Sequence, residues 1–255
     1  MAFSIIRHAF AMVFGNFGQA LRLSIGPFAL TALVIYIVAQ MLDIGMISIA
    51  FMMMQPASAD PVIALFVIAA IIASTFTTAW VAVAWHRFIL LEEYVQLLPQ
   101  VRDRPIMGYI LTSLAISFWV IIASFIAGLI VGFALAATGL QDAVVPAFIG
   151  GLLIGLVVSF VWFRLGLSLP ALAIGEKMRL RESLAATKPI SGTILQVVLI
   201  VALLNALGQS AIGTMAGLGM TVTIIASLAL YWVSFMVGLS ILTTFYGHLI
   251  EGRDL

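Results

Sequence analysis

The sequence predicts an all-α integral membrane protein with six transmembrane helices, and three observations support this prediction. Hydrophobic residues make up 64% of the 255 residues and charged residues only 8%, with a mean hydropathy of +1.26. A soluble domain of this length needs far more polar surface. The apolar residues form runs that reach the roughly 20 residues a membrane-spanning helix requires. The 11 Lys and Arg residues stand only between alternate runs and near the chain ends, which gives the runs a shared orientation.

The six apolar runs are expected to form three antiparallel hairpins at 24–86, 107–172 and 191–247, within one transmembrane domain covering 1–255. Helices are required because backbone amides inside a bilayer must be paired within their own segment. The individual crossings are expected at 24–53, 62–86, 107–138, 146–172, 191–216 and 220–247.

The basic residues predict which ends of the helices face the cytoplasm. The links inside the hairpins carry only acids (Asp43, Asp60 and Asp142) or no charge, and a Gly-rich turn is expected at 217–219. Cytoplasmic loops retain Lys and Arg during insertion. We therefore predict that both termini lie in the cytoplasm. No cleavable signal peptide is expected, because Arg7 and His8 interrupt what would be its apolar core.

The hairpins resemble repeats of one unit. Their first helices start at similar intervals along the chain, and two of the second helices end in a Trp-x-Arg pattern, Trp85–Arg87 and Trp162–Arg164. Chance is the alternative, because apolar sequences resemble one another easily. Tryptophan is typical of the headgroup level, and arginine can reach past it to water. We expect this anchoring role, with Arg164 held inside the bundle by helix carbonyls or by an acid as the alternative.

Three segments are expected to lie in the cytoplasmic interface: an amphipathic helix at 4–22 and the segments 88–106 and 176–189. In 4–22 the polar and apolar side chains separate onto two faces at helical spacing. Pro189 is expected to close the helix in the last segment. These segments suit a collar around the bundle, and a docking surface for lipid or a partner is the alternative.

Small residues at spacing four predict where helix backbones come close. The third and fourth crossings carry Gly128 with Gly132, and Gly151 with Gly155. We expect these four glycines to pack the second hairpin tightly. A seam between two copies of the chain is the other interpretation.

Polar side chains within the apolar runs offer two interpretations. Thr75 and Thr78 lie in the second crossing, and Asn205 and Gln209 share one face of the fifth. They could line a path for a solute, or they could only form hydrogen bonds between helices. Ion or proton coupling is disfavoured because such proteins carry ionisable groups at mid-membrane depth.

The run from Arg164 through Pro170 to Glu176, followed by Ser183 and Thr187, resembles a group of uncharacterised six-helix bacterial inner-membrane proteins. These are related to the membrane domain of some bacterial glycerophosphodiester phosphodiesterases. The resemblance covers most of the chain but depends mainly on residues 162–192. It implies the six-helix scaffold, with Arg164, Pro170 and Glu176 as recurring features, and without the soluble catalytic barrel of those enzymes.

The sequence favours a non-enzymatic scaffold or accessory subunit of a membrane complex that contacts lipids. It contains no HExxH, no phosphate-binding loop and no Gly-x-Ser-x-Gly, and without cysteine it has no thiolate chemistry. A metal site built from His86, Glu92, Glu93 and His248 is conceivable but less expected than ordinary interface polarity. No cofactor, metal or nucleic acid is expected. Anionic lipid heads at the cytoplasmic face, a protein partner or a second copy are the expected partners, and a small-solute or lipid transporter or channel is the alternative function.

Overall fold

The computed structural model describes residues 1–45, 48–49, 60–95, 98–140 and 143–254. All regular structure in these ranges is helical, as predicted. Within them, six helices are long and apolar enough to cross a membrane, so the chain is a polytopic membrane protein. Most of the first predicted link, residues 55–61, and Asp142 of the second lie outside the described residues.

Helices make up most of the described chain. In chain order they are α1 (Ala2–Gly15), α2 (Phe17–Met41), α4 (Pro61–Leu91), α5 (Ile106–Ala137), α6 (Val144–Leu165), α7 (Ser168–Ala173), α8 (Leu180–Thr187), the 3-10 turn η2 (Lys188–Ile190), α9 (Ser191–Met215), η3 (Ala216–Leu218) and α10 (Met220–Leu249). Gly219 starts α10 with φ +108°, a conformation that favours glycine, so the predicted Gly-rich turn is present.

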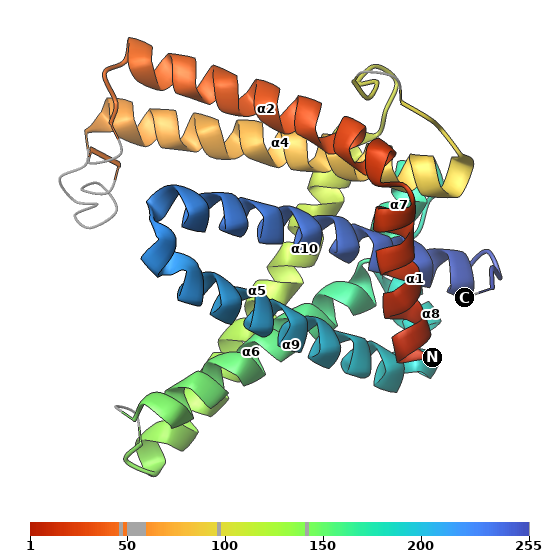
Figure 1. Cartoon of the computed structure of the whole chain (residues 1–255). Helices are drawn as coiled ribbons and strands as arrows, with labels where there is room; N and C mark the ends of the chain where they lie inside the picture. Colours follow the sequence, from red (N-terminus) through yellow and green to blue (C-terminus); the bar gives the residue numbers. More distant parts are fainter. Residues whose placement is uncertain (46–47, 50–59, 96–97, 141–142, 255) are drawn as a thin grey trace.

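The long helices pack in sequential pairs, α2 with α4, α5 with α6, and α9 with α10. The pairs meet at the end of the molecule that holds both termini, α1, α7 and α8, and they separate toward the opposite end (Figure 1). The Lys and Arg residues belong to the segments at the first end, which we call the basic end; the other is the far end.

The core lies at the basic end. In α4 burial is nearly continuous from Thr77 to Leu90, and in α10 from Met236 to Gly247. The short helix α7 contacts α4, α5 and α10 and has all but one of its residues buried. We call these parts of α4, α7 and α10 the hub. Toward the far end the same long helices expose large apolar side chains, which suits lipid surroundings.

The predicted interfacial helix and first crossing have the wrong boundaries. A helix was expected at 4–22 and a crossing at 24–53, but the chain bends at Asn16 and α2 already starts at Phe17. The Asn16 amide donates a hydrogen bond of 2.9 Å to the carbonyl of Met12, which completes the end of α1. Apolar residues stand on both sides of Gly15 and Asn16, so the hydropathy pattern was interpreted as one continuous helix. α1 packs its buried side against α10 and α9.

The predicted fourth crossing, 146–172, is two helices. α6 ends at Leu165, and the chain turns at Gly166 before α7 begins. A Cβ atom at Gly166 would lie 2.6 Å from Leu242 Cδ2 and 2.8 Å from the Trp162 carbonyl oxygen, so this turn against α10 requires glycine. In the predicted interfacial segment 176–189, helix α8 ends before Pro189, and η2 leads directly into α9.

The prediction named the wrong glycines for the close contact between α5 and α6. α5 and α6 pack along their length, yet a Cβ atom would meet no described atom within 4 Å at Gly132, Gly151 or Gly155, and at Gly128 only Ile154 at 4.0 Å. The close contact is at Gly150, where a Cβ would lie 2.5 Å from Val131 Cγ1. Adjacent helix positions differ by about 100° in direction, so an error of one residue selects another face.

Replacing Gly150 by alanine is expected to lower the free energy of unfolding by about 1–2 kcal/mol through overpacking. The Val131 side chain cannot move aside easily, because β-branched residues in helices have one preferred rotamer. The midpoint of thermal unfolding in detergent measures this change. Gly151→Ala is the matched control and is expected to be neutral or slightly stabilising. An equal loss in both variants would show that the contact at Gly150 is not special.

Candidate functional site

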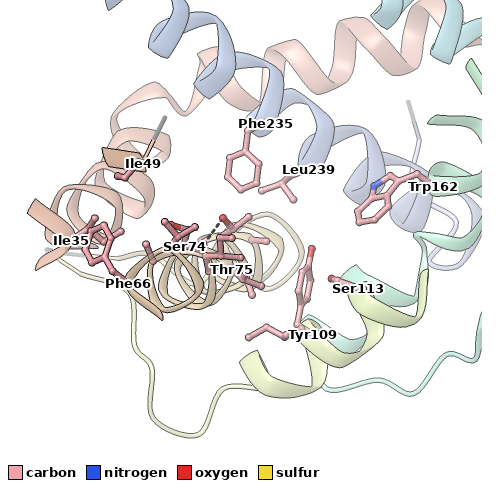
Figure 2. A pocket seen from close by; sticks show the side chains of 17 residues that line it. Ile35, Ile49, Phe66, Ser74, Thr75, Tyr109, Ser113, Trp162, Phe235 and Leu239 are labelled. Carbon is pink, nitrogen blue, oxygen red and sulfur yellow. Dashed lines mark hydrogen bonds between the residues drawn. The ribbon is translucent and has the colours of Figure 1, made fainter. Parts of the chain in front are cut away.

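A crevice of about 580 Å³ lies beside the hub. Side chains of α2, α4, α5, α6 and α10 line it, including Ile35, Phe66, Trp162, Phe235 and Leu239 (Figure 2). The lining is almost entirely apolar, and among the described residues it contains no Asp, Glu, Lys, Arg or His. We call it the first crevice. Its chemistry suits a hydrocarbon chain better than a charged solute.

The polar side chains of the first crevice carry mainly hydroxyls, and two of the α4 hydroxyls are already engaged. Thr75 donates to the carbonyl of Ile71 and Thr78 to that of Ser74, both over 2.8 Å. Each of these two hydroxyls already donates its only proton within its own helix, so it can only accept a further hydrogen bond. This row of hydroxyls is therefore weakly polar.

His86 is fully buried in the hub, and its neighbour Tyr109 lines the first crevice. Its Nδ1 is 2.8 Å from Thr243 Oγ1, and its Nε2 is 3.2 Å from the Tyr109 hydroxyl. Thr243 donates its own proton to the carbonyl of Leu239, so we infer that Nδ1–H donates to Thr243 and that Nε2 accepts from Tyr109. One neutral imidazole thereby connects α4, α5 and α10, and both of its nitrogens are engaged.

The residues of the conceivable metal site are not brought together. His86 is buried in the hub and bonded to Thr243 and Tyr109. Glu93 instead pairs with two arginines, and His248 Nδ1 lies 2.9 Å from the Arg253 carbonyl oxygen. Glu92 is exposed at the end of α4. No group of three His, Asp or Glu side chains in the described ranges has the spacing of a metal site.

The expected anchoring role is wrong for Trp85. Its side chain is fully buried, and its indole N–H donates to Ser240 Oγ of α10 over 3.0 Å. Trp162 is half-buried and lines the first crevice. Trp85 therefore contributes to the packing of the hub, whereas the headgroup level offers tryptophan both lipid and water.

Arg87 also points inward. Its Nε donates to Glu93 over 2.9 Å, and its Nη1 donates to the carbonyl of Ala173, at the end of α7, over 3.0 Å. Glu93 also pairs with Arg104, so one carboxylate holds two guanidinium groups. The Arg87 and Arg104 side chains are only 17% and 16% exposed, which makes this ion-pair network stronger than a typical surface pair.

Arg164 binds the segment that follows it. Its Nε donates to Thr187 Oγ1 over 2.8 Å, Nη1 to Ser191 Oγ over 2.6 Å, and Nη2 to the Leu184 carbonyl over 3.0 Å. The Ser183 hydroxyl donates in return to the Arg164 carbonyl over 2.8 Å. The arginines of both Trp-x-Arg patterns therefore donate to helix carbonyls, which is the alternative stated for Arg164. The acids near Arg164 in sequence, Glu176 and Glu182, do not form an ion pair with it.

The other two residues of the Arg-Pro-Glu pattern occupy different surroundings. Pro170 is buried within α7 and contributes to the hub. Glu176 is exposed after α7, and its backbone N–H donates to the Ala171 carbonyl over 2.9 Å. Pro170 thus has a packing role, and the Glu176 side chain takes part in no ion pair within the described chain.

The four polar residues of the predicted path lie in separate places. Thr75 and Thr78 line the first crevice, whereas Asn205 faces a smaller cavity between α9 and α10. The Asn205 side chain accepts a hydrogen bond of 2.7 Å from Ser234 and donates one of 3.0 Å to the Val201 carbonyl. Gln209 is exposed and lines neither cavity. Asn205 therefore has the helix-linking arrangement that was the second interpretation.

Sequence reasoning missed Tyr109, Thr243 and Arg104. Tyr109 and Thr243 follow no recognisable pattern, because their role depends on where three helices meet. The partners of Arg164 did have a signal: Ser183, Thr187 and Ser191 recur at spacing four and so share one helix face. No family model matches the chain, and no curated protein or solved structure was found to be similar to it. The resemblance of residues 162–192 therefore stays a prediction.

A double-mutant cycle tests the His86–Tyr109 contact. His86→Leu is expected to lower the free energy of unfolding by about 2–3 kcal/mol, because it leaves buried hydroxyls unpaired. Tyr109→Phe alone should cost about 1 kcal/mol, and the double variant should lose less than the sum of the two. Chemical unfolding in mixed micelles measures all three. Additive losses would show that the two side chains do not interact.

Glu93→Gln is expected to lower the free energy of unfolding by about 1–2 kcal/mol, because two half-buried guanidinium groups lose their counter-charge. Glu92→Gln removes the same charge one residue earlier, where the side chain is exposed, and should change stability by less than about 0.5 kcal/mol. Thermal unfolding at low and high salt compares the pair. Equal effects of the two variants would contradict the network.

Proposed function

We propose that this protein is a non-enzymatic membrane scaffold or accessory subunit whose crevices hold lipid chains. The observation that supports this most is the first crevice: about 580 Å³ of apolar space, beside a rigid hub and between helices that expose apolar side chains. Such a space inside a bilayer suits hydrocarbon, because its lining is almost entirely apolar and holds no charged side chain among the described residues.

The arrangement of the polar side chains argues against catalysis. A general acid or base must reach its substrate with a free proton or lone pair. Both ring nitrogens of His86 are engaged, and Glu93 is held by two arginines. These contacts join helices to one another, which suits a scaffold.

For the orientation we propose that the basic end lies in the cytoplasm of a bacterial cell and the far end on the outer side of its inner membrane. The gathering of the Lys and Arg residues at one end of the helices supports this. Anionic lipid heads are the expected neighbours of the basic end.

Transport is the second candidate, and the hydroxyls of Ser74, Thr75 and Thr78 along the first crevice favour it. A water-filled path from this crevice to the basic end, however, would have to pass the buried hub, where His86 is bonded to Thr243 and to Tyr109 of α5. A transporter would open this contact during its cycle, whereas a scaffold would keep it closed.

Spin labelling distinguishes a lipid-filled crevice from a water-filled one. Since the chain has no cysteine, Thr75→Cys carries a unique label in the first crevice. In proteoliposomes we expect this label to be relaxed by oxygen, which dissolves in lipid, and hardly by a polar nickel complex. Ile72→Cys, on an exposed part of α4, provides the lipid reference, and Arg102→Cys, in the exposed loop before α5, the water reference. Relaxation of the Thr75 label by nickel at the level of Arg102 would favour transport instead.

A further inference from the structure

A second crevice of about 570 Å³ lies between α5, α6 and α8 and combines apolar walls with positive charge. Its walls come from Trp119, Ile122 and Ile126 of α5 and from Phe160 of α6. Arg164, in the last turn of α6, and Arg181, in the first turn of α8, also line it. A cavity with hydrocarbon walls and two guanidinium groups suits an amphipathic anion.

The charge of Arg164 is fixed in place but not neutralised. Its three hydrogen-bond acceptors are two hydroxyls and a backbone carbonyl, all without formal charge. No carboxylate of the described residues forms an ion pair with it. A guanidinium group has five N–H donors, so two are left over beyond these three bonds. The nearby Phe160 ring, 5.7 Å from Cζ, further restricts its orientation.

Arg181 supplies a second positive charge at the same crevice. It is exposed, and within the described part of the chain it has no ion-pair partner. The adjacent acid, Glu182, accepts a hydrogen bond of 2.7 Å from the backbone N–H of Arg179. This contact at the start of α8 engages the carboxylate that could most easily neutralise Arg181.

The walls define what kind of anion fits. From Trp119 to Ile126 the wall extends for about 10 Å along α5, at 1.5 Å per residue, a distance that several methylene groups of an acyl chain cover. Arg164 stands where the apolar run of α6 ends, the level at which headgroup phosphates meet cationic side chains. A soluble phosphate ester would leave these walls without contact.

We propose that the second crevice binds an anionic glycerophospholipid, with its phosphate between Arg164 and Arg181 and one acyl chain along Trp119 and Ile126. Guanidinium groups bind phosphate oxygens through paired, charge-assisted hydrogen bonds. An anionic headgroup is preferred over choline, because two guanidinium groups repel a quaternary ammonium. This proposal rests on the lipid-contacting role proposed above and adds the class of lipid and its site.

A comparison of the binding of two lipids with the same acyl chains tests the proposal. The full-length protein, stripped of lipid in detergent, is titrated with phosphatidylglycerol or with phosphatidylcholine, and bound lipid is counted by native mass spectrometry. We expect phosphatidylglycerol to bind more tightly and Arg181→Gln to weaken it about tenfold, which corresponds to about 1.4 kcal/mol. Arg179→Gln removes the same charge two residues away, outside the lining, and should change binding less than twofold.

Two further measurements separate the walls from the charges. Ala123→Trp fills the apolar part of the crevice while both arginines stay, and it should also weaken phosphatidylglycerol binding about tenfold. Glycerol phosphate, the headgroup without chains, should not displace the lipid. Displacement by glycerol phosphate, equal binding of both lipids, or equal effects of the Arg181 and Arg179 variants would overturn the anionic-lipid site and leave the lipid-contacting scaffold standing. If the protein retains neither lipid, both proposals fail.

Discussion

The hydrogen bonds of His86 set the geometry on which the three helix pairs depend. A single buried imidazole joins α4 to α5 through Tyr109 and to α10 through Thr243. Lipid tails are as apolar as leucine, so burial of apolar side chains does little to hold helices together in a bilayer. Directed contacts must do so, and Trp85 with Ser240 adds another between α4 and α10. Because these contacts lie at one end, the pairs are fixed there and separate elsewhere.

The class of fold could be predicted from the sequence, but the positions of the breaks and turns between its helices could not. Six long apolar runs and a one-sided distribution of Lys and Arg are properties of whole segments, so they survive errors of several residues. The turn at Gly166 lies inside an apolar stretch, and the break at Asn16 is flanked by apolar residues on both sides, so neither ends a run of high hydropathy. A turn there depends on close approach of another helix, as with Leu242 at Gly166, and one sequence gives no measure of that.

The candidate site was predicted least well, for a related reason. Arg87 and Arg164 were expected to point toward water because arginine at the end of an apolar run usually does. In the structure each instead reaches a carbonyl of a short helix, of α7 and of α8 respectively. Short helices leave carbonyls unpaired at their ends, and an arginine nearby satisfies them. The predicted close packing at Gly128, Gly132, Gly151 and Gly155 is not found, because small residues mark an accessible face without saying whether a partner occupies it.

The separation of the helix pairs away from the hub gives the molecule an unequal profile across the bilayer. The buried apolar core lies at the basic end, where the three pairs meet. Toward the far end the ribbons of the three pairs diverge, and their long helices expose large apolar side chains (Figure 1). We therefore expect the protein to occupy different lateral areas in the two monolayers of a bilayer, and an inclusion of unequal area bends a flexible membrane toward the monolayer in which it occupies less area.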